Sequence, residues 1–144
     1  MKNTPKSPKL FFDTSALLSG LNSPLGASGF IISLFKLKKV VIVISPEVIL
    51  EAEKTIQEKF PLLRDALINF LLNKPVITKK LTPKELLLAY KLIRSEDTPI
   101  LAGALKAKTD YLITLDKKFQ RLAQNRTGFK ILLPGEFLKI FREV

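Results

Sequence analysis

Carboxylates are the side chains of this sequence with the greatest capacity for chemistry, because the chain contains neither His nor Cys. Without imidazole and thiol groups, a Ser-His-Asp triad, a cysteine nucleophile and a Cys/His zinc site are excluded. Hydrolytic chemistry must therefore rest on carboxylates, lysines, hydroxyls or a metal ion held by oxygen ligands. Only five of the 144 residues are Asp, so their positions are informative.

Three of these Asp residues belong to one edge of the predicted sheet, where strands end and helices begin. Asp13 directly follows an apolar strand at Leu10–Phe12, and Asp116 lies two residues after a strand at Tyr111–Thr114. Asp97 stands at the start of a helix. In an open parallel sheet, ligands bind beyond the carboxyl ends of the strands, where the following helices begin. We therefore expect these three carboxylates on one rim of the molecule.

A helix after the second strand adds two Glu residues to this rim. Glu47 and Glu51 are four positions apart, which places them on one helix face. Carboxylates from four segments repel one another unless a cation neutralises them, and Mg²⁺ or Mn²⁺ prefers such hard oxygen ligands. A metal-filled acidic site in a basic molecule is the arrangement expected for cutting a phosphodiester backbone.

Each of these acids also has a local explanation. Asp13 and Asp97 can serve as N-caps of the helices that follow them, and Asp116 can be a turn or cap residue. Glu51 belongs to the kind of polar stripe found on any solvated helix face. Thr114, beside Asp116, can bind phosphate or simply end its strand. From the sequence, the convergence of four positions favours function, and no single residue decides the question.

The elements that position these residues alternate between strand and helix along the chain. Such alternation predicts an α/β protein with a parallel sheet covered by helices on both faces. Clear helix starts include Ser45-Pro46, Pro61, and the capping box Thr82-Pro83-Lys84-Glu85. We expect strands at 10–12, 40–44, 75–78, 111–114 and 130–133, with helices at 15–21, 28–39, 46–59, 61–72, 83–93, 98–108, 117–124 and 135–142.

Length and charge indicate the number of domains, the kind of partner and the location of the protein. A chain of 144 residues fits one domain, which we place at residues 10–144 after a basic flexible arm at 1–9. Lys and Arg number 24 against 13 Asp and Glu, a net charge of +11 that attracts polyanions such as nucleic acid, although such charge also serves solubility. With no secretory signal and no apolar run near ~20 residues, we expect a cytoplasmic protein that does not enter membranes.

The four acidic segments resemble the motifs of one known family, the PIN domains (PilT N-terminus). Their spacing along the chain and the residues around each acid are similar to that family's pattern from about Lys9 to Phe141. The segments are Leu10-Phe11-Phe12-Asp13-Thr14-Ser15, Ser45-Pro46-Glu47-Val48-Ile49-Leu50-Glu51, Glu96-Asp97-Thr98-Pro99 and Tyr111-Leu112-Ile113-Thr114-Leu115-Asp116. Within the family, the chain is most similar to the toxin components of toxin–antitoxin pairs that are called VapC-like.

The resemblance implies a three-layer α/β/α sandwich with a central parallel sheet and a Mg²⁺- or Mn²⁺-dependent ribonuclease. Asp13, Glu51, Asp97 and Asp116 would be the catalytic, metal-holding residues, with Ser15 and Thr114 as hydrogen-bonding support. RNA would be the substrate, an antitoxin protein a partner, and the toxin a homodimer. A metal that lowers the pKa of bound water also removes the need for an imidazole base.

The sequence departs from the family pattern at two positions where further acids are common. Thr98 follows the third acid, and Lys118 lies two residues after the fourth. Glu47 and Glu96 are candidates to compensate, and the Lys117-Lys118 pair can contact phosphate instead. A non-catalytic PIN-like module that binds RNA or protein is therefore the alternative. A phosphotransferase of the haloacid dehalogenase type is disfavoured, because Ser15 occupies the place of its second Asp.

Overall fold

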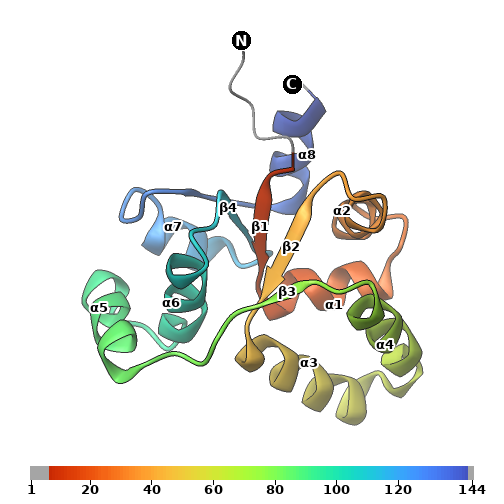
Figure 1. Cartoon of the computed structure of the whole chain (residues 1–144), viewed down its shortest axis with the longest axis horizontal. Helices are drawn as coiled ribbons and strands as arrows, with labels where there is room; N and C mark the ends of the chain where they lie inside the picture. The colour runs from red at the N-terminus through yellow and green to blue at the C-terminus, as the bar shows by residue number, and fades with distance from the viewer. Residues whose placement is uncertain (1–6, 143–144) are drawn as a thin grey trace.

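The structure is a computed structural model that describes residues 7–142, in which five parallel strands form one sheet between layers of helices (Figure 1). In chain order the strands are β1 (Lys9–Phe12), β2 (Val41–Ile44), β3 (Val76–Ile77), β4 (Tyr111–Ile113) and β5 (Lys130–Leu132). Their order across the sheet is β3-β2-β1-β4-β5, and every neighbouring pair is parallel. The predicted α/β/α sandwich is confirmed, with β1 at its centre.

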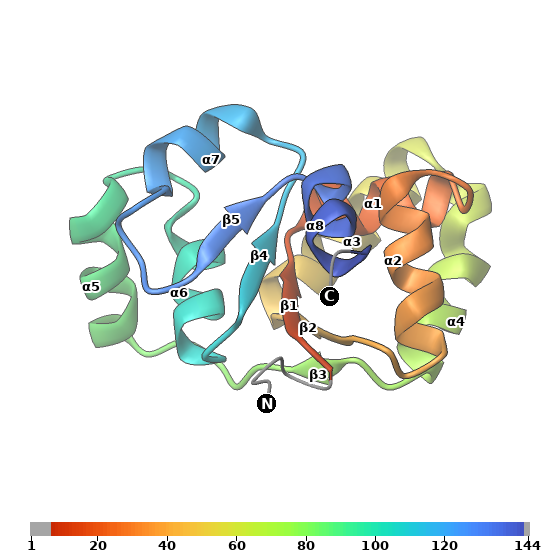
Figure 2. The ribbon, with the colours of Figure 1, turned by 90° about the horizontal axis from the view of Figure 1, so that it is seen from above.

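Helices cover both faces of this sheet. Figures 1 and 2 show α5 and α6 on one side and α1, α2 and α8 on the other. Within residues 7–142, no single helix is long and apolar enough to cross a membrane, although α1 and α2, bent by 88°, pass that test of length and composition as a pair. The helical elements are α1 (Thr14–Asn22), α2 (Ala27–Lys36), α3 (Pro46–Lys59), the 3₁₀ turn η1 (Pro61–Leu63), α4 (Arg64–Leu72), α5 (Pro83–Ile93), α6 (Thr98–Lys106), α7 (Lys117–Ala123) and α8 (Pro134–Arg142).

Local sequence signals account for most of these elements. The Ser45 hydroxyl accepts the backbone N–H of Val48 and starts α3, as predicted. The capping box on α5 is also confirmed, because Thr82 and Glu85 exchange both of its hydrogen bonds. The apolar strands β1 and β2 are buried on both faces, which is the pattern of a helix-covered parallel sheet, whereas the edge strand β3 is exposed.

The structure corrects several predicted boundaries. Helix α2, predicted to end at Lys39, ends at Lys36. Pro61 opens a 3₁₀ turn, and the α-helix starts at Arg64 instead. Helix α6 stops at Lys106, because Lys108 turns into the left-handed region with φ of 53°. Strand β3 has only two residues, although the backbone N–H of Thr78 still bonds to the Ile44 carbonyl.

The structure describes only residues 7–9 of the predicted flexible arm at 1–9. Residues 1–6 of that arm lie outside the described residues. Lys9 belongs to β1, where its backbone N–H donates to Asp110 at 2.7 Å and its ammonium donates to the Ala107 carbonyl at 3.2 Å. The folded part of the chain therefore begins before residue 10.

Helix α6 packs closely against the central strand through a glycine. A Cβ atom at Gly103 would lie 3.0–3.1 Å from two ring carbons of Phe11, which is fully buried in β1. Asp97 begins α6 and Asp13 follows β1, so this contact joins the two elements that carry these carboxylates.

We predict that Gly103→Val destabilises the fold by about 1–3 kcal/mol, because the added methyl groups overpack a buried contact. Thermal melts followed by circular dichroism measure this loss. Gly135→Val is the matched control, since nothing lies within 4 Å of a Cβ placed there. Equal melting temperatures for the two variants would contradict close packing at Gly103.

Candidate functional site

The carboxylate of Asp13 lies at the end of the central strand, and only 8% of the residue is exposed. Its Oδ1 accepts the backbone N–H of Ala16 at 2.9 Å and the Ser15 hydroxyl at 2.7 Å. Its Oδ2 accepts the hydroxyl of Thr114, which follows β4. The predicted cap of α1 is therefore real, and the same side chain is also tied to the neighbouring strand.

Burial dominates the electrostatics of this carboxylate. Removal from water raises the pKa of Asp13, and the hydrogen bonds from Thr114, Ala16 and Ser15 only partly oppose that effect. The nearby charge of Asp97 raises the pKa further. The folded chain thus holds an acidic group in a place where its negative charge is disfavoured.

The Thr114 hydroxyl joins Asp13 to Asp116. While it donates to Asp13, it accepts the backbone N–H of Asp116 at 3.0 Å. Asp116 in turn caps α7, because its Oδ1 accepts the N–H of Phe119 at 3.1 Å. A second link crosses the same gap, where the N–H of Leu115 donates to the Ser15 hydroxyl at 3.1 Å.

Asp97 stands at the N-cap position of α6, but its side chain makes no capping hydrogen bond. Its closest polar partner is the Ser95 hydroxyl at 3.4 Å. Burial raises the pKa of Asp97, followed by the charges of Asp116, Glu96 and Glu51. The local explanation from capping therefore fails for Asp97, which instead lies within electrostatic reach of the other acids.

Glu51 is exposed on α3 and is turned toward α1. The Thr14 hydroxyl donates to its Oε1 at 2.6 Å, across 37 residues of sequence. Thr14 was not among the predicted site residues. The only signal for it in the sequence is its place beside Asp13, since nothing in the spacing shows that α1 and α3 meet.

The two additional acids lie in different surroundings. Glu96 is exposed and close enough to raise the pKa of Asp97. Glu47 is partly buried, and its Oε1 has no hydrogen-bond partner in the described part of the chain. A buried carboxylate oxygen without a donor is costly, so this atom would gain from a nearby cation.

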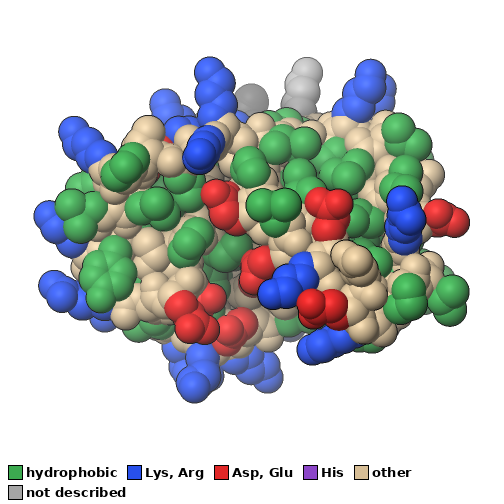
Figure 3. All heavy atoms as spheres, turned by 90° about the horizontal axis from the view of Figure 1, so that it is seen from below, with side chains coloured by type: hydrophobic (Ala, Val, Ile, Leu, Met, Phe, Trp, Pro, Cys, Tyr) green, Lys and Arg blue, Asp and Glu red, His purple; other side chains and the backbone are tan. Residues whose placement is uncertain are grey.

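Figure 3 looks at the molecule from below, toward the side where α1 and α3 begin in Figure 1. Asp and Glu side chains gather in the middle of this face, and Lys and Arg side chains mostly surround them. The charges that raise the pKa values of Asp13 and Asp97 belong to acids of all four motifs, so these acids lie in one region. Even so, among residues 7–142 no three acidic side chains are gathered tightly enough to hold a metal ion by themselves.

The chemistry of the donors nevertheless fits a divalent cation. Every donor is an oxygen, the pKa values of Asp13 and Asp97 are raised, and Glu47 Oε1 lacks a partner. Mg²⁺ keeps several water ligands and is commonly held by one or two carboxylates together with phosphate oxygens. An open set of carboxylates therefore suits Mg²⁺ or Mn²⁺ without a closed cage.

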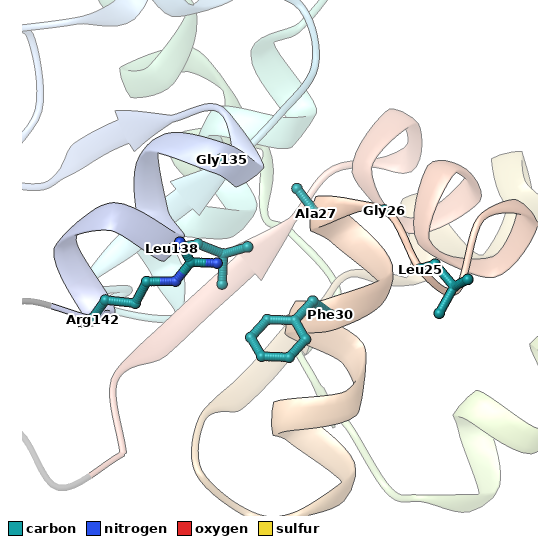
Figure 4. A pocket seen from close by; sticks show the side chains of 7 residues that line it. All are labelled: Leu25, Gly26, Ala27, Phe30, Gly135, Leu138 and Arg142. Atoms are coloured by element: carbon teal, nitrogen blue, oxygen red, sulfur yellow. The ribbon is translucent and has the colours of Figure 1, made fainter.

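A pocket of about 400 Å³ lies elsewhere, between α2 and α8 (Figure 4). Leu25, Phe30 and Leu138 line it, and Arg142 lies at its margin. None of the candidate carboxylates borders it. The pocket is therefore separate from the acidic rim.

The fold is that of an α/β protein with a parallel sheet, and the acids lie at the carboxyl ends of its strands, where ligands bind in this class. Comparison with sequence models of known families identifies the family. The sequence model of the PIN domain matches residues 9–118, so the chain belongs to the PIN domain family. No curated protein matches the chain.

A comparison of folds agrees with this assignment. The chain is similar to one chain in the crystal structure of VapBC2 from Rickettsia felis bound to a DNA fragment from their promoter. The TM-score is 0.62 at 17% identity, covering 87% of this chain and 98% of the other. At that identity the likeness shows a common fold.

We predict that Asp97→Asn raises the melting temperature of the metal-free protein at pH 7. Because the pKa of Asp97 is raised in the folded state, the free energy of unfolding falls as the pH rises above the unfolded-state value of 3.8. Replacing the charged group with a neutral amide removes the cost of burying the charge and its repulsion by the other acids. We expect a gain of roughly 2–5 °C, corresponding to about 1 kcal/mol. The gain should shrink as the pH falls toward 4.

Melts in EDTA at pH 7 and pH 4 measure this difference, with Glu58→Gln, exposed near the carboxyl end of α3, as the control. Adding Mg²⁺ should then stabilise the wild type more than the Asn variant, since a bound ion stabilises only the state that holds it. A gain at pH 7 no larger than that of Glu58→Gln would contradict the clustering of charge at Asp97.

Proposed function

We propose that this chain is a metal-dependent endoribonuclease that hydrolyses RNA phosphodiester bonds and acts as the toxin of a toxin–antitoxin pair. The observation that supports this most strongly is the proximity of carboxylates from four separate segments of the chain. The charge of Asp97 raises the pKa of Asp13, and the charges of Asp116 and Glu51 raise the pKa of Asp97. Family membership adds support, because the PIN domain model matches residues 9–118, a range that contains all four acids.

The residues of the site would have three roles, which are to hold the cation, to position its ligands and to contact the RNA. Asp13 and Asp97 would hold the cation together with Asp116 and Glu51, and the ion when bound would neutralise the acids and lower the pKa of a water molecule for attack on phosphorus.

Ser15 and Thr114 fix the Asp13 carboxylate with hydrogen bonds from two elements. Thr14 orients Glu51 from the first residue of α1. Lys117 and Lys118, next to Asp116, are exposed and suited to contact the RNA backbone.

A second candidate function is a non-catalytic PIN-like module that binds RNA or protein. The observation that favours it is the absence of three tightly gathered acids in the described residues, together with Thr98 and Lys118 in positions that are often acidic. Titration calorimetry with Mn²⁺ separates the two functions. A nuclease binds the ion and loses that binding in Asp97→Asn, whereas a non-catalytic module shows no difference.

The partners stay proposals as well. The solved relative contains VapBC2 bound to DNA, which supports an antitoxin as a partner of this chain. A homodimer and a cytoplasmic location follow from the family resemblance and from the sequence. A mass of one chain by light scattering, 16.2 kDa, would overturn the homodimer.

We predict that the purified protein cleaves RNA with Mg²⁺ or Mn²⁺ and not in excess EDTA. Asp116→Asn should lower the rate more than about 100-fold, because loss of a ligand costs more than loss of a ligand's support. Glu58→Gln should cleave at the wild-type rate, since it lies away from the rim. Cleavage of a labelled RNA on denaturing gels measures all three, and full activity in EDTA would rule out the proposal.

Thr114→Val tests the hydroxyl that joins two of the acids. The variant keeps the shape of the side chain and removes a donor to Asp13 and an acceptor for the Asp116 N–H. We expect cleavage to fall by about 10–100-fold, the usual effect of losing support for a metal ligand. Raising the Mn²⁺ concentration should recover part of this loss, whereas an unchanged rate would deny Thr114 a role in positioning.

A further inference from the structure

Lysines occupy the edge of the sheet opposite the acids. Strands β1 and β5 begin with Lys9 and Lys130, and the other three strands each follow a lysine within three residues. Because all strands are parallel, these positions share the amino-terminal edge. Figure 2 shows the starts of the strands and the ends of α2, α4 and α6 along its lower side. The exposed members, which we call the amino-edge lysines, are Lys36, Lys38, Lys39, Lys74, Lys108 and Lys130.

No ion pair in the described residues offsets the charge of these lysines. Among residues 7–142 the structure contains one ion pair, between Lys106 and Glu85, and it involves none of the amino-edge lysines. Asp110 is the acid at the same edge, where its Oδ2 accepts the backbone N–H of Lys9 and its single charge offsets one of the six lysines at most. Lys9 itself is committed to the fold, because its ammonium donates to the carbonyl of Ala107.

Helix ends explain only part of this pattern. A cation at the carboxyl end of a helix interacts favourably with the helix dipole, which accounts for one lysine at each of α2, α4 and α6. It does not account for three lysines within four residues at the end of α2, or for Lys130 at the start of a strand. Lys38, Lys74 and Lys108 have φ of 63°, 62° and 53°, where Gly would relieve strain but would remove the charge.

The spacing of the strands orders these charges in a row. Across the sheet the row runs from Lys74 at β3 through Lys39 at β2 to Lys108 at β4 and Lys130 at β5. Five strands at ~4.8 Å intervals span about 19 Å, which is long enough to contact several successive phosphates of one nucleic-acid strand.

We propose that the amino-edge lysines form a second RNA-binding surface, which holds the phosphate backbone of the substrate away from the point of cleavage. The inference rests on the proposed function for the identity of the nucleic acid. The charge of the surface gives it affinity without sequence specificity, since phosphate contacts position a nucleic acid and do not read its bases. The acidic rim, on the other edge of the sheet, repels RNA wherever no cation is bound. The basic edge therefore supplies the attraction.

The test compares RNA binding by two variants of equal charge. Lys39→Gln, Lys74→Gln and Lys130→Gln are combined in one protein, and Lys59→Gln, Arg64→Gln and Lys91→Gln, all exposed on α3, α4 and α5, in the control. Fluorescence anisotropy with a labelled RNA hairpin is measured in EDTA, so that the readout does not depend on cleavage. The amino-edge variant should bind roughly tenfold more weakly, with the slope of log K against log salt reduced by about 2. The control should keep most of the wild-type affinity and slope.

Equal weakening of the two variants would overturn the inference, as would unchanged RNA binding by the amino-edge variant. Loss of binding to phosphatidylserine vesicles with RNA binding intact would also overturn it and would assign the surface to membranes. Circular dichroism melts confirm that both variants fold. If the wild type fails to cleave RNA with Mg²⁺ while the amino-edge variant still loses RNA binding, the nuclease proposal fails and this surface stands.

Discussion

The buried carboxylate of Asp13 is the group on which the arrangement of the site depends. It lies at the end of the central strand, where its oxygens receive donors from α1 and from the residue that follows β4. A buried carboxylate needs such donors, because an unsatisfied one costs several kcal/mol in order-of-magnitude terms. Satisfying Asp13 therefore fixes Ser15 and Thr114, and Thr114 in turn fixes the start of the segment that carries Asp116. The negative charge of Asp13 is still disfavoured by burial and by Asp97, which lowers the stability of the fold but favours the binding of a cation.

The parallel sheet separates charge along the strand direction. Acids follow β1, β2 and β4 at the carboxyl edge, and a lysine begins each strand or precedes it within three residues at the amino edge. In a chain of net charge +11, this separation gives one molecule two surfaces of opposite sign. A nuclease of the proposed kind needs both, since the RNA backbone must be attracted to the protein while the reacting phosphate meets an acidic, metal-requiring centre. The fold thus provides the separation without a second domain.

Sequence reasoning succeeded where chemistry is local. The strand before Asp13, the cap at Ser45 and the capping box from Thr82 to Glu85 depend on neighbouring residues, and all are present. It could not decide questions that depend on contacts between distant segments. That Asp97 does not cap its helix, and that Thr14 bonds to Glu51, follow from how α6 and α3 pack against the first strand and helix. The row of lysines likewise emerges only from the strand order, which places β3 and β5 at opposite edges.

The most direct measurement of the central claim is a crystal structure of the protein grown in several millimolar MnCl₂, with anomalous diffraction data collected above the manganese absorption edge. The carboxylate cluster predicts an anomalous peak at the acidic rim, contacted by oxygens of Asp13 and Asp97 and completed by water. Small rotations of the exposed Glu51 and Asp116 side chains would accompany it. A rim with no manganese, or a manganese ion bound only at other acids such as Asp65, would contradict the account.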